Sequence, residues 1–348
     1  MPNHALNGLT CAVQRNCHIA DARHGADYTM CVYLMKMREY YRWEKGLGYD
    51  ARLPKEDIGE WLMQREELWE SLSEADFDPL EIDGELYDPF DSESVNEALL
   101  PHGFVYSGGL GKAARPHFFL GTLMRQERPG DFSILVADRE LARDLASPPA
   151  MTGGRTIYVR RESLRRMLWE KLENWRWSRL DNALGRALSH YPFDADLNGA
   201  LDAMTDNELD AVQWHEVGEC QAAERLGERW NSMLLDLGHT PAELMARAVR
   251  DHLADCTSTL PRLVEHERLA SIHFYVGNLN GMRKEVFPGL IGAYREWDQT
   301  RDGEALLAIS AVGRDHWETV AREMLDLHAG LGPDAAAPIA DLVRGSYL

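Results

Sequence analysis

The sequence has few basic residues and no long uncharged run. Its 348 residues include 37 Lys and Arg against 57 Asp and Glu, giving a formal net charge of −20. Proteins that coat nucleic acid or an anionic membrane need clustered positive charge. No stretch without a charged residue exceeds 14 residues, whereas a membrane-spanning helix needs about 20 apolar residues. We therefore expect neither a nucleic-acid partner nor a membrane partner.

Cysteine is also scarce, with five residues and no CxxC pair. An odd number of cysteines without such a pair fits reduced thiols better than a disulfide framework. The first ten residues contain no Lys or Arg, which argues against a secretory signal peptide. The sequence therefore predicts a cytoplasmic protein of bacterial type.

Several catalytic motifs are missing or incomplete. Neither a GxGxxG nor a GxSxG pattern occurs in the chain. The segment His215–Glu219 resembles the HExxH pattern of zinc peptidases, but Glu219 stands where that pattern has its second histidine. We therefore do not expect peptidase activity.

The negative charge is concentrated in one part of the chain. Residues 50–97 contain 17 acidic and 3 basic residues. The last part of this stretch, residues 76–97, contains the turn signals Asp78-Pro79, Asp83-Gly84 and Asp88-Pro89. We predict an acidic loop here, which serves solubility or docks a basic partner.

A basic stretch follows in residues 155–179, with eight Arg and Lys and three Glu. Leu164, Leu168, Leu172 and Trp175 are spaced as one apolar face of a helix. The favoured interpretation is a helix whose arginines are solvated. The alternative is an anion-binding or nucleic-acid-binding face with tryptophans available for stacking.

The hydrophobic pattern predicts a mainly α protein, a multi-helix bundle with a small inserted α+β module. One long helix is expected over residues 16–45, short strands near 103–109, 117–126, 132–137 and 156–159, and a short helix over 139–145. Later helices begin at capping boxes, Thr205–Glu208 and Thr240–Glu243. The predicted division is residues 1–75 as N-terminal helices of the bundle, 76–97 as the acidic loop, 98–160 as the module and 161–348 as the remaining bundle.

Two acidic residues interrupt the apolar face of the helix expected after Thr205. Leu209, Val212, Ala223 and Leu226 continue that face at steps of three and four, but positions 216 and 219 are glutamates. A carboxylate that faces another helix is costly unless it is paired or binds a metal. His215 and Glu219 are four residues apart and can share one ion. Pairing with arginine is the alternative for both glutamates.

Two further helices carry possible ligands at the same spacing. Asp21, His24, Tyr28 and Cys31 follow one another on one face of the expected N-terminal helix. His266 and His273 share a face farther along the chain. Helical bundles build one- or two-metal centres from such residues.

These patterns predict a metal centre between helices. The ligand candidates are Asp21, His24, His215, Glu216, Glu219, His266 and His273, with Tyr28 and Cys31 beside them as catalytic candidates. Mixed oxygen and nitrogen ligands favour iron or manganese, with zinc as an alternative. The leading hypothesis is a non-haem di-metal oxidoreductase acting on a small molecule that the sequence does not identify. The alternative is a non-catalytic interaction protein that docks a basic partner, and a homodimer is compatible with either.

Two segments also resemble a known group of proteins. CHIADARHGADYTMCVYLMKMREYYRWEKG and VADRELARDLASPPAM resemble uncharacterised bacterial proteins labelled "Sfum-type". The resemblance covers most of the chain and implies no activity.

Overall fold

The computed structural model describes residues 1–111, 115–279 and 281–348. Its contacts divide the chain into two compact units. The N-terminal unit comprises Met1–Lys171 and Phe193–Asp206, and the C-terminal unit comprises Leu172–Pro192 and Asn207–Leu348. We describe each unit by itself.

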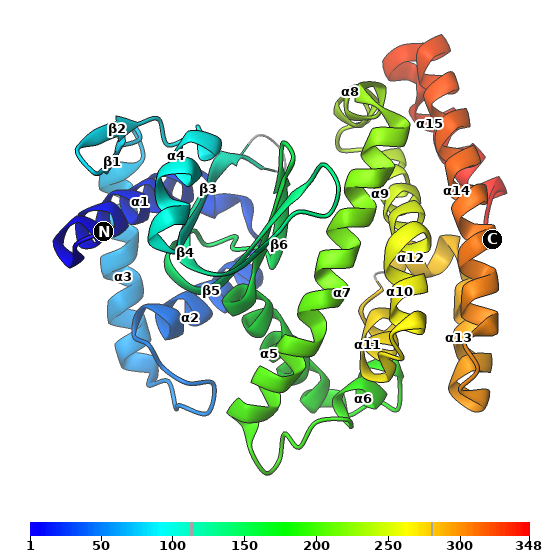
Figure 1. Ribbon diagram of the computed structural model, residues 1–348, viewed down its shortest axis with the longest axis horizontal. Coiled ribbons are helices and arrows are strands. Elements are labelled where there is room, and N and C mark those ends of the chain that lie inside the picture. The colour runs from blue at the N-terminus through cyan, green and yellow to red at the C-terminus, as the bar shows by residue number, and fades with distance from the viewer. Residues whose placement is uncertain (112–114, 280) are drawn as a thin grey trace. The chain divides into compact units, whose positions relative to one another are not determined.

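The N-terminal unit combines helices with a curled sheet (Figure 1). Its helices are α1 (Asn3–His24), α2 (Met30–Glu44), α3 (Lys55–Leu72), α4 (Ser92–Leu99) and the start of α5 (Arg161–Ser178), with 3-10 turns at Gly25–Asp27 and Leu100–His102. Its strands are β1 (Leu80–Ile82), β2 (Glu85–Tyr87), β3 (Phe104–Leu110), β4 (Pro116–Glu127), β5 (Ser133–Arg143), β6 (Ala150–Gly153) and β7 (Thr156–Arg160).

The main sheet has the strand order β3-β4-β5-β7-β6. Strands β5 and β7 are parallel, and the other neighbouring strands are antiparallel. Helix α1 packs on β4 and β5, with Leu9, Val13 and Cys17 buried in the same cluster as Phe118 and Leu120. This packing places the polar residues of α1 beside the end of β5.

The C-terminal unit is helical in the residues described. It contains α6 (Ala183–Leu188), most of α7 (Leu197–Leu226), α8 (Glu228–Asp236), α9 (Pro241–Ala254), a π-helical turn η4 (Asp255–Thr259), α10 (Leu260–Glu265), α11 (Leu269–Asn278), α12 (Gly281–Val286), α13 (Pro288–Thr300), α14 (Glu304–Leu331), a 3-10 turn (Gly332–Ala335) and α15 (Ala336–Gly345). Helix α14 packs against α9, α10 and α13. The prediction of a mainly α protein with a small α+β module is thereby confirmed.

The predicted single helix over residues 16–45 is wrong. Helix α1 ends at His24, a 3-10 turn follows, and Tyr28 and Thr29 are extended before α2 begins at Met30. The turn starts at Gly25, which is buried against Trp69, where an added Cβ would lie 3.5 Å from the indole ring. Asp21 and His24 therefore do not share a helix with Tyr28 and Cys31.

The predicted short helix over residues 139–145 is also wrong, because β5 continues to Arg143. The register between β4 and β5 shifts around Gly121. An added Cβ at Gly121 would lie only 2.8 Å from the carbonyl oxygen of Arg139. The glycine therefore permits a close backbone approach that the hydrophobic pattern does not reveal.

Only one of the two predicted capping boxes caps a helix. Thr240 Oγ1 accepts a hydrogen bond from the N–H of Glu243 at the start of α9, as predicted. Thr205 lies inside α7, and its hydroxyl donates to the carbonyl oxygen of Leu201 over 2.6 Å. The helix expected after Thr205 is the later part of α7, which ends at Leu226, and Gly227, whose φ of 71° is positive, separates it from α8.

The stretch predicted as an acidic loop, residues 76–97, contains the β1–β2 hairpin and most of α4. Asp91 caps α4 by accepting from the N–H of Ser94. Docking of a basic partner on this stretch stays a prediction.

Candidate functional site

A cavity of about 870 Å³ lies in the N-terminal unit. Five parts of the chain form its wall: α1, α2 with the loop that follows it, β5, the first two turns of α5, and the start of α7. Many of the lining side chains are charged or aromatic: Glu39, Arg42, Trp43, Glu44, Tyr49, Asp138, Arg139, Glu140, Arg143, Arg161, Glu162, Arg165, Arg166 and Asp202. Cavities of this size commonly hold small molecules.

Glu140 in the cavity wall belongs to an ion pair with no solvent exposure. Arg160 Nε donates to Glu140 Oε1 over 2.6 Å, and both side chains are 0% exposed. The hydroxyl of Ser163 donates to the same oxygen over 2.7 Å. Although burial opposes ionisation, Arg160 and Arg143 lower the pKa of Glu140 below its ordinary value. Glu140 is therefore a carboxylate at neutral pH.

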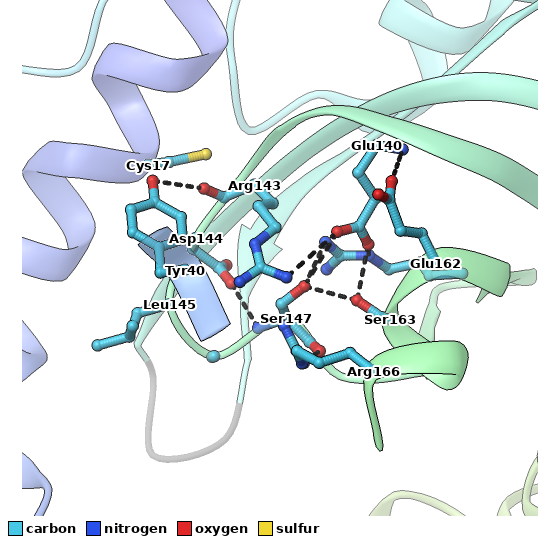
Figure 2. A network of polar contacts seen from close by, with 12 residues as sticks. Cys17, Tyr40, Glu140, Arg143, Asp144, Leu145, Ser147, Glu162, Ser163 and Arg166 are labelled. Atoms are coloured by element: carbon cyan, nitrogen blue, oxygen red, sulfur yellow. Dashed lines mark hydrogen bonds and ion pairs between the residues drawn. The ribbon is translucent and has the colours of Figure 1, made fainter. Parts of the chain in front are cut away.

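The segment that follows β5 reaches this ion pair through Ser147 (Figure 2). Ser147 Oγ lies 2.6 Å from Ser163 Oγ and accepts from Arg160 Nη2 over 2.8 Å. Asp144 accepts from the N–H of Ser147 over 2.7 Å. Both oxygens of Asp21 accept from the N–H of Leu145 at 3.0 Å. The predicted ligand Asp21 thus holds the backbone of the segment.

Asp21 is buried among other polar groups. Burial and the nearby Asp144 raise the pKa of Asp21 well above its ordinary value, against the hydrogen bond from Leu145. Cys17, one turn earlier on α1, donates its thiol to the carbonyl oxygen of Phe118, and burial raises its pKa. This environment favours the protonated forms of Asp21 and Cys17.

The aromatic ring of Tyr49 lies in the cavity wall. Tyr49 stacks on Trp169 with ring centroids 5.2 Å apart. The guanidinium groups of Arg42 and Arg165 lie 5.4 and 5.0 Å from the Tyr49 centroid. Burial raises the pKa of Tyr49 to about 12. Rings and guanidinium groups therefore support one another in this wall.

The remaining N-terminal candidates lie near the turn between α1 and α2. His24 Nδ1 lies 3.2 Å from an oxygen of Asp27. The ammonium group of Lys36 lies 5.1 Å from the ring centroid of Tyr28. Burial, together with Asp21, raises the pKa of Tyr28. Cys31 is an exposed free thiol. These three residues do not line the cavity.

In the C-terminal unit, the structure brings His215 and Glu219 together. His215 Nε2 lies 3.5 Å from Glu219 Oε1, and its Nδ1 lies 2.7 Å from Asp255 Oδ1. Arg250 donates to Glu219 over 2.9 Å. Burial opposes the charge of each group, but His215 and Arg250 lower the pKa of Glu219 to about 2, and Asp255 raises the pKa of His215 well above its ordinary value.

Asp255 is the centre of this network, and sequence reasoning missed it. The carboxylate has no solvent exposure and accepts from Tyr275, Thr259 and Arg283 in addition to its contact with His215. Although burial opposes ionisation, Arg283 and His215 hold its pKa below its ordinary value. It begins the π-helical turn η4, and such turns are rare and often mark functional sites.

The other predicted ligands of this unit have different partners. His266 is exposed and stacks on Trp214 at 5.1 Å. His273 Nδ1 lies 2.8 Å from the Tyr294 hydroxyl, and burial lowers the pKa of His273 to about 4. Glu216 acts electrostatically on Arg250.

Within residues 1–111, 115–279 and 281–348, no group of three or more His, Cys, Asp and Glu side chains is arranged to hold a metal ion. Arginine pairing, the alternative considered for Glu219, is what the structure shows. The iron or manganese centre stays a prediction.

The cavity itself was not predicted. Its lining residues come from separate parts of the chain, α1, α2 with the loop that follows it, β5, α5 and α7, and the basic segment 155–179 was the only available signal. In the part of the chain that the structure describes, no helix is long and apolar enough to cross a membrane.

Comparison with known families identifies both halves of the chain. The N-terminal domain of a family of unknown function (DUF6866) matches residues 8–160, and the C-terminal domain of the same family matches residues 165–346. The chain therefore belongs to this family. Neither the curated proteins nor the solved structures gave a match.

Proposed function

We propose that this member of the DUF6866 family binds a small polar molecule in the cavity of its N-terminal unit. The observation that carries the proposal is the cavity of about 870 Å³, lined by charged groups and by the rings of Trp43 and Tyr49. Ligand pockets typically have volumes of about 300–1,000 Å³ with a few fixed polar groups. The buried pair with Arg160 fixes the position of Glu140 in this wall.

Two exposed cysteines allow this proposal to be tested. Cys11 lines the cavity, whereas Cys31 is exposed outside its lining. The full-length chain is first screened for thermal stabilisation by a collection of small polar metabolites, since a ligand that binds only the native state raises the midpoint of unfolding. Each hit is then measured on protein that carries a bulky maleimide at Cys11 in a Cys31→Ser background.

The matched control carries the same maleimide at Cys31 in a Cys11→Ser background. We expect the label on Cys11 to weaken binding by at least about tenfold, because it occupies the cavity, and the label on Cys31 to leave binding unchanged. Equal binding by both labelled proteins, or the absence of any hit, would contradict the proposal.

A metal centre in the C-terminal unit is the second candidate function. Its specific support is the approach of His215 and Glu219 to 3.5 Å beside Asp255. A metal here would have to displace Arg250 from Glu219, since the two are 2.9 Å apart. Iron or manganese bound in this way would supply redox chemistry for the predicted oxidoreductase.

A further inference from the structure

Arg143 and Arg166 are buried in the cavity wall, and neither has a carboxylate oxygen within hydrogen-bonding distance among the described residues. We propose that the ligand of the cavity carries an oxyanion, a phosphate or a carboxylate, and that Arg143 and Arg166 bind it. This inference rests on the proposed function and adds the chemical class of the ligand.

Three buried guanidinium groups share one glutamate. Arg143, Arg160 and Arg166 are 1%, 0% and 8% exposed, and Glu140 is 3% exposed. Oε1 of Glu140 accepts hydrogen bonds from Arg160 and Ser163. Its other oxygen lies 3.7 Å from Arg143 Nη1, which is beyond hydrogen-bonding distance. Of these three arginines, Arg160 therefore donates a hydrogen bond to Glu140 and Arg143 does not.

Arg143 lacks a close acceptor of its own. Its Nε is buried, and no hydrogen-bond partner for it exists among the described residues. The guanidinium instead lies 5.2 and 5.0 Å from the ring centroids of Tyr40 and Trp43. These rings hold the group in place beside the cavity. Because a buried charge is costly unless it is paired, Arg143 is the group that an anion in the cavity would stabilise most.

Arg166 adds a second guanidinium to the same wall. Its Nη2 donates to the carbonyl oxygen of Ser147, and its Nε lies 3.6 Å from Glu170. Burial, together with the neighbouring Arg143, lowers the pKa of Arg166 to about 10. Two like charges are thus held close together, and a shared anion would relieve their repulsion.

The other charged groups near Arg143 and Arg166 have hydrogen-bond partners of their own. Lys36 Nζ lies 3.4 Å from the carbonyl oxygens of Leu145 and Ala146 and contributes one more positive charge. Asp144 uses its two oxygens for the N–H groups of Ser147 and Phe118. Asp21 has a raised pKa, which favours its neutral form.

The acids of the cavity wall already have cationic partners. Glu39 accepts from Arg38 and Arg42 over 2.7 and 3.1 Å. Asp202 accepts from Arg165 over 2.8 Å and lies 3.3 Å from Arg161. Glu44 pairs with Arg65, and Asp138 lies 3.7 Å from Arg161.

The last acid of the wall is Glu162. Its Oε2 accepts from the N–H of Glu140 over 2.6 Å, while burial and the charge of Glu140 raise its pKa. Glu162 is thus held by a backbone donor in surroundings that disfavour its charge. Arg143 and Arg166 are thus buried arginines of the wall whose carboxylate contacts, at 3.7 and 3.6 Å, lie beyond hydrogen-bonding distance, so a ligand's oxyanion can pair with them.

The position of α5 strengthens this attraction. The helix begins at Arg161, and its first two turns contribute Arg161, Glu162, Arg165 and Arg166 to the wall. A helix N-terminus carries partial positive charge and favours anions. Guanidinium groups match the planar geometry of carboxylates and the oxygens of phosphates, and they bind both through paired hydrogen bonds.

The test measures anion binding to the full-length chain by calorimetry at constant ionic strength. Inorganic phosphate and pyrophosphate form one series, succinate and citrate form the second, and sorbitol is the neutral control. We expect one of the two anion series to bind and sorbitol not to bind, and the series that binds identifies the oxyanion. Arg166→Gln should weaken that binding by at least about tenfold.

Arg155→Gln is the matched control, because Arg155 is exposed and lies outside the lining of the cavity. It removes the same charge and should change binding by less than about twofold. If Arg166→Gln does not fold, Arg166→Lys keeps the charge, loses the paired donors and should still weaken binding more than Arg155→Gln.

Two outcomes would overturn the inference. One is the absence of binding by either series up to about 10 mM. The other is equal weakening of binding by the Arg166 and Arg155 variants. A neutral hit that the label on Cys11 blocks, without any anion binding, would overturn this inference and leave the proposed function standing. Failure of the proposed function is shown separately by the maleimide experiment.

Discussion

Arg160 donates from Nε to Glu140 over 2.6 Å, and neither side chain is exposed to solvent. Removal of one member of such a pair leaves the other charge buried without a partner, which typically costs about 3–5 kcal/mol. We therefore expect Glu140→Ala to lower the free energy of unfolding by about that amount in urea denaturation. Asp131→Ala is the control, because its pair with Arg155 is exposed, and it should change stability by less than about 1 kcal/mol. Similar losses for both variants would show that the buried pair contributes no more than a surface pair.

Glu208 provides a pH-dependent prediction. It is 2% exposed, accepts from Ser271 over 2.7 Å, and burial raises its pKa to about 7. The folded state therefore holds a proton that the unfolded state releases near the ordinary pKa of 4.5. This contribution to stability is present below about pH 4.5 and is lost as the pH rises through about 7.

Glu208→Gln removes this titration and should exceed the wild type in stability at pH 8 by about 1–3 kcal/mol. At pH 5 the two proteins should be similar. Urea denaturation at both pH values measures the difference. A constant difference between them would contradict the raised pKa.

The metal hypothesis makes a prediction of its own. If His215 and Glu219 bind iron, manganese or zinc, the purified protein should contain about one equivalent, and Glu219→Ala should lose it with the fold retained. Element-resolved mass spectrometry with circular dichroism measures both properties. Metal content below about a tenth of an equivalent, without recovery on reconstitution, would contradict the hypothesis.

Two threonines with the same sequence pattern should respond differently to substitution. Thr240→Val removes an N-cap and should destabilise the C-terminal unit by about 1 kcal/mol. Thr205 lies inside α7, where its hydroxyl donates to the carbonyl oxygen of Leu201. Thr205→Val should therefore lower the free energy of unfolding by less than about 0.5 kcal/mol. Thermal unfolding distinguishes the two. A larger loss at Thr205 would indicate that its hydroxyl stabilises α7.

The sequence predicted elements better than it predicted their ends. The strands β3, β4 and β7 and the cap at Thr240 follow from local patterns, and the structure contains them. The 3-10 turn that follows α1 begins at Gly25, which is buried against Trp69. That contact joins residues far apart in the chain, so periodicity around residue 25 does not reveal it.

In the polar sites too, the sequence predicted contacts between residues close in the chain and missed contacts between distant ones. Spacing placed His215 beside Glu219, and the structure has them together. Their partners Asp255 and Arg250 come from η4 and α9, and no local pattern indicated that they would meet. Arg143 and Arg166 lie on separate elements and share one wall only because β5, β7 and α5 fold together.

The most direct test of oxyanion binding in the cavity is the nuclear magnetic resonance spectrum of the arginine side chains. In protein labelled with ¹⁵N-arginine, the Nε–H signals of Arg143, Arg166 and Arg155 are assigned by single substitutions to lysine. Titration with the oxyanion that binds in calorimetry should shift the signals of Arg143 and Arg166 in a saturable manner and leave that of Arg155, which lies outside the cavity lining, in place. Unchanged signals from Arg143 and Arg166, with shifts confined to exposed arginines, would contradict the account.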